Sequence, residues 1–310
     1  MVVTFFQEMD FFLKIETAAS TGFVVNLFMQ LISPLLLSLF CTCLWLAPVA
    51  AQQSDYPWLS QVDESQALVY RIPPPPGFAR ASAAPESFAA WLRHLPLKSE
   101  GAAVFLHNGA LKGNQQAHFA VLDIDTGKGD LQQCADAVMR LRAEYLLACG
   151  AASSISFNFT SGHPAVYEKW QQGYRPQIQG NAVNWRKTAG PDGSYAGFRK
   201  YLETVFTYAG TWSLSKELKP VSQPDSLRAG DVFIWGGFPG HAVIVVDVAL
   251  HPGTGEKRFL LAQSYMPAQD MHILQNPRQP GNPWYEIPAG TLYTPEWTFE
   301  AGTLMRFAQP

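Results

Sequence analysis

The stretch from residue 227 to residue 266 constrains the fold more than any other part of the chain. It reads LRAGDVFIWGGFPGHAVIVVDVALHPGTGEKRFLLAQSYM, with β-branched and aromatic runs separated by glycine and proline. Such runs predict three strands joined by a glycine-rich turn and a loop. Short connections make successive strands antiparallel, so an antiparallel sheet is expected here.

Helical patterns precede these strands. Apolar residues recur at helical spacing between Asp130 and about Leu147, and Asp130 is expected to cap this helix, with Gln133 completing a capping box and Gly150 closing the helix. The segments AVYEKWQQGYRP and GFRKYLETVFTYAG also predict helices. Helices followed by strands indicate an α+β fold.

The chain divides by pattern into three parts. Residues 126–310 are expected to form the core domain, and residues 52–125 an N-terminal α/β segment packed on it. In that segment ALVYRIPPPPGFAR is interpreted as a strand interrupted by a proline run, PESFAAWLRHLPL as a helix, and GAAVFLHNG and HFAVLDID as strands.

Residues 1–51 are interpreted as an export signal. An apolar run without charges ends in VAAQ, where small residues precede a cleavage site that would leave Gln52 first. Acidic residues near the start are atypical of a signal, so we expect the true start to be Met29. A membrane anchor over residues 23–48 is the alternative, because the run is long enough to span a bilayer. With the signal cleaved, no membrane span is expected.

Charge and motifs exclude several classes of function. The net charge of −3 and the pI near 6.2 give no basic surplus, so nucleic-acid binding is not expected. The sequence has no glycine-rich phosphate loop or dinucleotide fingerprint, so no cofactor is expected. The histidines at positions 163, 251 and 272 lack ligand spacing, so no metal is expected either.

Two cysteines, Cys134 and Cys149, remain once the signal is removed. At about 1.5 Å per residue of helix they lie roughly 20 Å apart, too far for a disulfide. Cys134 is expected in or next to the first helical turn, where the helix dipole lowers a thiol pKa, whereas Cys149 lies at the opposite end. Cys134 is therefore the candidate nucleophile; the alternative is a buried cysteine that only packs.

His241 is the candidate general base. It is expected at the first residue of a strand, just after glycines that include Gly240, which leave room for a ligand or another backbone. Asp247 is too far along the strand to orient the ring. The next strand returns antiparallel and can bring Gln263 close to His241 for a hydrogen bond. The alternative is that Gln263 pairs only with the edge of the sheet.

Longer motifs carry a resemblance to known proteins. LQQCADAVMRLRAEYL, FNFTSG, YAGTWSLSKELKPV, PGHAVIVVD and FLLAQSYMPAQDMHIL resemble a family of exported bacterial proteins classed as a domain of unknown function. More distantly, a cysteine at a helix start, then LRAGDVF, then a glycine-flanked histidine, is similar to NlpC-type papain-like hydrolases of the cell wall.

The second resemblance implies roles for individual residues. It implies a papain-like fold with Cys134 as nucleophile, His241 as base and Gln263 as the residue that orients the ring. The Cys134 backbone N–H is the expected oxyanion donor, with Gln133 as a second. The family usually has an acidic residue where this chain has Gln133, which leaves the substrate open.

The function expected from the sequence is an exported, periplasmic or envelope cysteine hydrolase that cleaves an amide or peptide bond in a peptidoglycan-like peptide. Candidate substrate-binding residues are Gln133, Trp235 and Gly240. The alternative is a non-catalytic binding or scaffold domain with an aromatic groove, for which the candidates are Trp170, Tyr174, Trp185, Trp235 and Trp284. An acyl or lipid hydrolase with the same two catalytic residues is a third possibility.

Overall fold

The computed structural model describes residues 56–308. The expected export signal, the start at Met29 and the alternative membrane anchor lie outside this range. No helix within residues 56–308 is long and apolar enough to cross a bilayer. Residues 56–308 belong to one compact unit.

The helices of the described chain are mostly short. They are α4 (Leu68–Arg71), α5 (Phe88–Arg93), α6 (Cys134–Ala148), α7 (Tyr167–Gln171), α8 (Tyr195–Tyr208) and α9 (Thr211–Glu217). Single 3₁₀ turns are η2 (Glu64–Gln66), η3 (Gln115–Ala117), η4 (Ala152–Ser154) and η5 (Pro224–Ser226). The interpretation of ALVYRI as a strand is wrong, because most of it is α4, and only Ala79 and Arg80, after the proline run, are extended.

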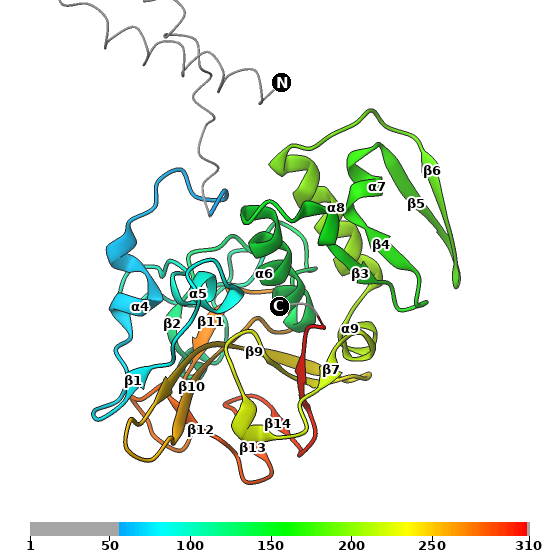
Figure 1. The fold of residues 1–310 in the computed structure, drawn as a ribbon. Coiled ribbons are helices and arrows are strands. Elements are labelled where there is room, and N and C mark those ends of the chain that lie inside the picture. Colours follow the sequence, from blue (N-terminus) through cyan, green and yellow to red (C-terminus); the bar gives the residue numbers. More distant parts are fainter. Residues whose placement is uncertain (1–55, 309–310) are drawn as a thin grey trace, which may run out of the picture. The chain divides into compact units, whose positions relative to one another are not determined.

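The strands are β1 (Ala79–Arg80), β2 (His118–Val121), β3 (Ser156–Asn158), β4 (Pro164–Val166), β5 (Tyr174–Gln179), β6 (Ala182–Lys187), β7 (Lys219–Pro220), β8 (Val232–Trp235), β9 (His241–Leu250), β10 (Lys257–Gln263), β11 (His272–Leu274), β12 (Tyr285–Glu286), β13 (Leu292–Tyr293), β14 (Thr298–Phe299) and β15 (Leu304–Arg306). Nine of them form one sheet, with the order β2-β11-β10-β9-β8-β15-β7, and with β1 and β12 pairing to β9 and β10 (Figure 1). The expected α+β class with an antiparallel sheet is confirmed.

The segment expected to be one helix from residue 165 to residue 176 changes direction instead. Helix α7 ends at Gln171, and the hairpin of β5 and β6 begins at Tyr174. Gly173 lies between them with a φ of +93°, and a Cβ there would be 2.1 Å from the carbonyl oxygen of Ala189. Only glycine fits this turn, so the glycine ends the helix.

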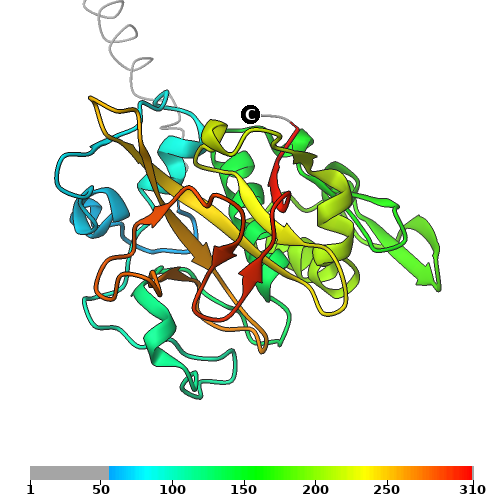
Figure 2. The ribbon, with the colours of Figure 1, turned by 90° about the horizontal axis from the view of Figure 1, so that it is seen from below.

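Strand β9 is the central strand of the sheet. It pairs with β10 from Ile244 to Leu250, while its other edge is covered by β8 near His241 and by β1 near Leu250. Its first nine residues are buried, because both faces are covered (Figure 2). The face with Ile244 packs in the core that includes α6, and the face with Val243 packs against β10, β13 and β14. A continuous apolar run is typical of a strand with two buried faces.

Asp247 interrupts this apolar strand and forms an ion-pair brace. Its side chain is fully buried, and its two carboxylate oxygens accept from Arg80 Nε at 2.7 Å and from Arg93 Nε at 2.8 Å. The backbone N–H of Val248 also donates to it at 2.9 Å. Asp247 therefore fastens β1 and α5 to β9, six residues along the strand from His241.

Candidate active site

The start of α6 sets the position of Cys134. The helix begins at Cys134 with Gln133 as N-cap, and the Gln133 backbone N–H donates to Asp136 Oδ2 at 3.0 Å. The expectation that Asp130 caps the helix is therefore wrong. The cap is Gln133, and the side chain that bonds back to its backbone is that of Asp136. Asp130 Oδ1 instead accepts from the Ala268 backbone N–H at 2.6 Å and from Gln133 Nε2 at 3.0 Å. Asp130 thus ties the approach to α6 to the loop after β10.

A second contact joins the same two segments. The Ser264 hydroxyl, which directly follows the end of β10, lies 2.9 Å from the carbonyl oxygen of Gln132. The Gln132 side chain accepts from Arg140 Nη1 at 2.7 Å, and the Arg140 guanidinium is fully buried. These bonds fix the first turn of α6 beside the ends of β9 and β10.

The Cys134 thiol lies against the backbone that flanks His241. Its Sγ is 4.0 Å from the carbonyl oxygen of Gly240. Burial first, and then the Asp136 carboxyl, raise the pKa of Cys134 to about 11, against the opposing effect of backbone N–H groups that include those of Ala135 and Ala242. The expectation that the helix N-terminus lowers this pKa is therefore wrong, because desolvation of the thiolate outweighs the local N–H groups.

Asp136 is a buried carboxyl behind the cysteine. Burial raises the pKa of Asp136 well above the usual range, and its Oδ1 is buried without a hydrogen-bond partner in the structure. A protonated Asp136 carries no charge that opposes ionisation of the thiol. Burial of Cys134 then remains the main reason for its raised pKa.

His241 is the first residue of β9, and its ring is packed among aromatic side chains. The ring centroids of Tyr265, Trp297 and Phe299 lie 4.8, 5.3 and 5.8 Å from that of His241. Burial lowers the pKa of His241 to about 4, although the hydrogen bond to the Gln263 side-chain oxygen opposes this shift. The imidazole is therefore neutral at pH 7 and able to accept a proton.

Four side chains form a buried polar chain that ends at this ring. His241 Nε2 lies 2.9 Å from Gln263 Oε1, Gln263 Nε2 donates to Glu296 Oε2 at 2.8 Å, and Lys112 Nζ lies 2.7 Å from both Glu296 oxygens. All four residues are at least mostly buried. The expected contact between Gln263 and His241 is present in the structure.

Hydrogen-bond chemistry fixes the direction of this chain. The Glu296 carboxylate, paired with Lys112, only accepts hydrogen bonds, so the Gln263 amide must present its NH₂ to Glu296 and its oxygen to His241. His241 Nε2 must then carry the hydrogen, which leaves Nδ1 with a free lone pair.

His272 also fixes the orientation of the Gln263 side-chain amide. Its Nε2 lies 3.3 Å from Gln263 Nε2, and its Nδ1 lies 2.9 Å from the carbonyl oxygen of Asp270. Since that carbonyl can only accept, Nδ1 of His272 carries the hydrogen, and Nε2 accepts from the second N–H of Gln263. Burial lowers the pKa of His272 to about 3, which keeps it a neutral acceptor.

Cys134 and His241 line one pocket of about 360 Å³. Other residues of its wall are Asp130, Leu131, Gln133, Phe206, Thr211, Phe238, Met266 and Trp297. A pocket that holds a thiol at a helix start and an imidazole with a free lone pair has the components of nucleophilic catalysis.

The three candidate substrate-binding residues have different places. Gln133 and Gly240 line the pocket, whereas Trp235 is not among the described residues of its wall. A Cβ on Gly240 would be 2.2 Å from Thr211 Oγ1 and 2.7 Å from the Trp235 carbonyl oxygen. Glycine at position 240 therefore admits neighbouring protein atoms rather than a ligand.

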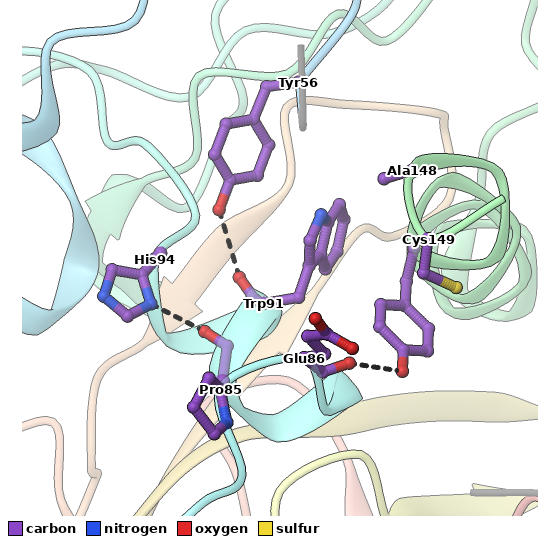
Figure 3. A pocket seen from close by; sticks show the side chains of 9 residues that line it. Tyr56, Pro85, Glu86, Trp91, His94, Ala148 and Cys149 are labelled. Carbon is purple, nitrogen blue, oxygen red and sulfur yellow. Dashed lines mark hydrogen bonds between the residues drawn. The ribbon is translucent and has the colours of Figure 1, made fainter. Parts of the chain in front are cut away.

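A second pocket, of about 400 Å³, lies at the other end of α6 and includes Cys149 (Figure 3). His94 also lines it, but in Figure 3 the indole of Trp91 stands between the His94 ring and Cys149. The Tyr145 hydroxyl donates to the Glu86 carbonyl oxygen at 2.9 Å within this wall. Cys134, in contrast, lines its pocket together with His241, and we therefore take the pocket at Cys134 as the candidate active site.

Glu296, Lys112 and His272 are site residues that the sequence did not reveal. Glu296 lies between β13 and β14, and Lys112 lies in the loop before η3. Neither lies in a recognisable motif, and 184 residues separate them. In residues 56–308, no group of three or more histidine, cysteine, aspartate or glutamate side chains is arranged to hold a metal ion.

The sequence profile of a family described as Domain of unknown function (4846) matches residues 68–306. No curated protein and no solved structure matches the chain. The similarity to NlpC-type hydrolases therefore remains a prediction from the sequence motifs.

Proposed function

The chain belongs to the Domain of unknown function (4846) family, whose description names no activity, so we propose a function from the site. We propose that the chain is a cysteine hydrolase of papain-like topology that cleaves an amide bond. Cys134 is the nucleophile, His241 is the general base, and Gln263 orients the imidazole. The observation that carries this proposal is the buried chain from Lys112 to His241, which leaves Nδ1 as the proton acceptor of a ring that lines the same pocket as Cys134.

The proposed reaction has two halves. His241 Nδ1 takes the thiol proton as Sγ attacks the amide carbonyl, and the Cys134 backbone N–H stabilises the resulting oxyanion. The C–N bond then breaks, and the leaving amine takes the proton from His241. Water, deprotonated by the same nitrogen, attacks the thioester, which releases the acid and restores the thiol.

The pKa values of the two residues define the resting state and its pH dependence. Because Cys134 titrates at about 11 and His241 at about 4, the neutral thiol and neutral imidazole coexist between these limits. We expect kcat/KM for an amide substrate to fall below about pH 4, as His241 becomes protonated, and to be flat near neutrality.

Alkylation of Cys134 by iodoacetamide should depend on pH differently, because this reagent needs the thiolate. Its rate, measured with Cys149→Ser to remove the second thiol, should rise about tenfold per pH unit through the neutral range. An alkylation plateau near neutral pH that disappears in His241→Ala would show a preformed thiolate–imidazolium pair and contradict this prediction.

Glu296 is a positioning residue in this proposal. Glu296→Gln replaces the acceptor-only carboxylate with an amide that can present either its oxygen or its NH₂ to Gln263, and it removes the negative charge beside Lys112, so both tautomers of His241 become accessible. We expect kcat to fall by about tenfold or more with little change in KM. In ¹⁵N NMR spectra, the Nε2–H form of His241 should dominate in the wild type and not in the variant.

The matched control for this prediction is Glu300→Gln, four residues along the chain. Glu300 is exposed, and its side chain accepts a long bond, of 3.2 Å, from the Thr291 hydroxyl. Its replacement should change neither kcat nor the His241 tautomer. A Glu296→Gln variant that loses stability but keeps the wild-type tautomer and kcat would refute the positioning role.

A non-catalytic binding domain is the second candidate function. The raised pKa of Cys134 and the exposed Phe238 and Met266 beside the pocket favour it. The aromatic groove expected from the sequence does not support it, because Trp170 and Trp284 are buried in the core. A Cys134 thiol that is alkylated only on unfolding would favour the binding domain over the hydrolase.

An amide of a cell-wall peptide is the substrate we propose on the basis of the sequence, through the expected export signal and the NlpC-type resemblance. The location would be the periplasm or cell envelope. Secretion of a tagged full-length chain and cleavage at Gln52, read by N-terminal sequencing, test the location separately from the chemistry.

A further inference from the structure

The described wall of the candidate pocket contains acidic side chains but no lysine or arginine. Its ionised side chain is Asp130, since the N–H groups of Ala268 and Gln133 bound to Asp130 lower the pKa of this carboxyl. Lys112 lies beneath Tyr265, 5.3 Å from the ring centroid, and its charge is compensated by Glu296. The pocket therefore offers a bound anion no free cation from these residues.

The mouth of the same pocket carries apolar side chains that face solvent. Phe238, in the loop between β8 and β9, is 84% exposed, and Met266, in the loop after β10, is 66% exposed. Both line the pocket, together with Leu131 and Phe206. Large apolar side chains with such exposure at the rim of a site are typical of a surface that a ligand covers.

From these two observations we infer that the substrate group entering the pocket is apolar and carries no negative charge near the scissile bond. The class is an amide whose acyl part is a hydrocarbon chain or an apolar amino-acid side chain. We therefore do not expect peptides with a carboxylate next to the scissile bond to be substrates. Among cell-wall peptides, those without such a carboxylate remain as candidate substrates. This inference rests on the proposed hydrolase, because it assumes that the substrate approaches Cys134.

The physical reason is the cost of desolvation. An anionic group entering this pocket would lose hydration without gaining a cationic partner, and the Asp130 carboxylate would repel it. An apolar group would instead cover Phe238 and Met266 and release the water over them. Both effects favour a neutral apolar acyl group over an anionic one.

Alkylation of Cys134 measures this preference without a known substrate. The full mature chain with Cys149→Ser is treated at pH 9 with iodoacetamide, iodoacetate or N-hexyl iodoacetamide, and each rate is divided by the rate of the same reagent with glutathione. We expect the normalised rate for iodoacetate to be about fivefold below that for iodoacetamide. The N-hexyl reagent should react about fivefold faster than iodoacetamide.

Three substitutions test which side chains cause the penalty on iodoacetate and which cause the advantage of the hexyl reagent. Asp130→Asn keeps the oxygen that accepts from Ala268 and Gln133, since both bonds end on Oδ1, and should reduce the penalty on iodoacetate. Met266→Ser and Phe238→Ser replace exposed side chains and should reduce the advantage of the hexyl tail. The comparison of the three reagents on the unsubstituted pocket does not depend on these variants folding.

The outcomes separate the two proposals. A Cys134 that reacts with all three reagents at equal normalised rates, or fastest with iodoacetate, overturns the substrate class and leaves the hydrolase intact. A Cys134 that reacts with none of them in the folded protein overturns the hydrolase, and the substrate class with it.

Discussion

Replacing Cys134 with alanine is expected to lower the rate of amide hydrolysis by at least about 10⁴-fold, because the variant has no atom that can form the acyl intermediate. The assay uses a fluorogenic N-acyl aminocoumarin amide with an apolar acyl group. Cys134 is only partly buried and makes one long polar contact, to Gly240, so the melting temperature should change little.

The matched control for this result is Cys149→Ser. Cys149 is exposed at the end of α6 and lies in the pocket of Trp91 rather than in that of His241. Its replacement should leave the rate within about twofold of wild type. A Cys134→Ala protein that keeps a tenth or more of the wild-type rate would show that the activity arises elsewhere.

Asp247→Ala is expected to have the largest effect on stability, about 3–5 kcal/mol. The substitution removes a fully buried carboxylate and leaves the guanidinium groups of Arg80 and Arg93, which are 16% and 13% exposed, without their anion. Chemical denaturation followed by tryptophan fluorescence measures the loss, and the melting temperature should fall by roughly 10 °C.

An exposed ion pair provides the comparison. Glu256 lies 2.5 Å from Arg258, and its side chain is 52% exposed. Glu256→Ala should cost less than about 1 kcal/mol, as surface pairs do. If Asp247→Ala lowered the free energy of unfolding no more than Glu256→Ala does, the buried ion pairs of Asp247 would contribute no net stability to the packing of β1 and α5 on β9.

The central strands could be predicted from the sequence because their order depends on residues that are close together in the chain. Strands β8, β9 and β10 follow one another with short connections, so their order and antiparallel sense follow from the positions of glycine and proline. The placement of Gln263 near His241 follows from the same hairpin geometry. These features depend on neighbours in the sequence.

The remaining parts depend on contacts that are distant in sequence. The true cap of α6 is Gln133 because Asp130 is engaged by Ala268, 138 residues away. The pKa of Cys134 rises because β9 packs over the start of α6 and removes water from the thiol. The residues next to Cys134 allow either an activated thiol at a helix start or a buried cysteine, and the packing of β9 determines how strongly the thiol is desolvated.

The buried chain from Lys112 to His241 also determines when activity can appear during folding. Its members come from positions 112, 241, 263 and 296, and non-local contacts of this kind form late. Without the contact to Glu296, the orientation of the Gln263 amide, and with it the tautomer of His241, is not fixed. The proposed hydrolytic activity should therefore reach its full rate only when the segment that carries Glu296 has docked, so a partly folded chain would act more slowly than the native protein.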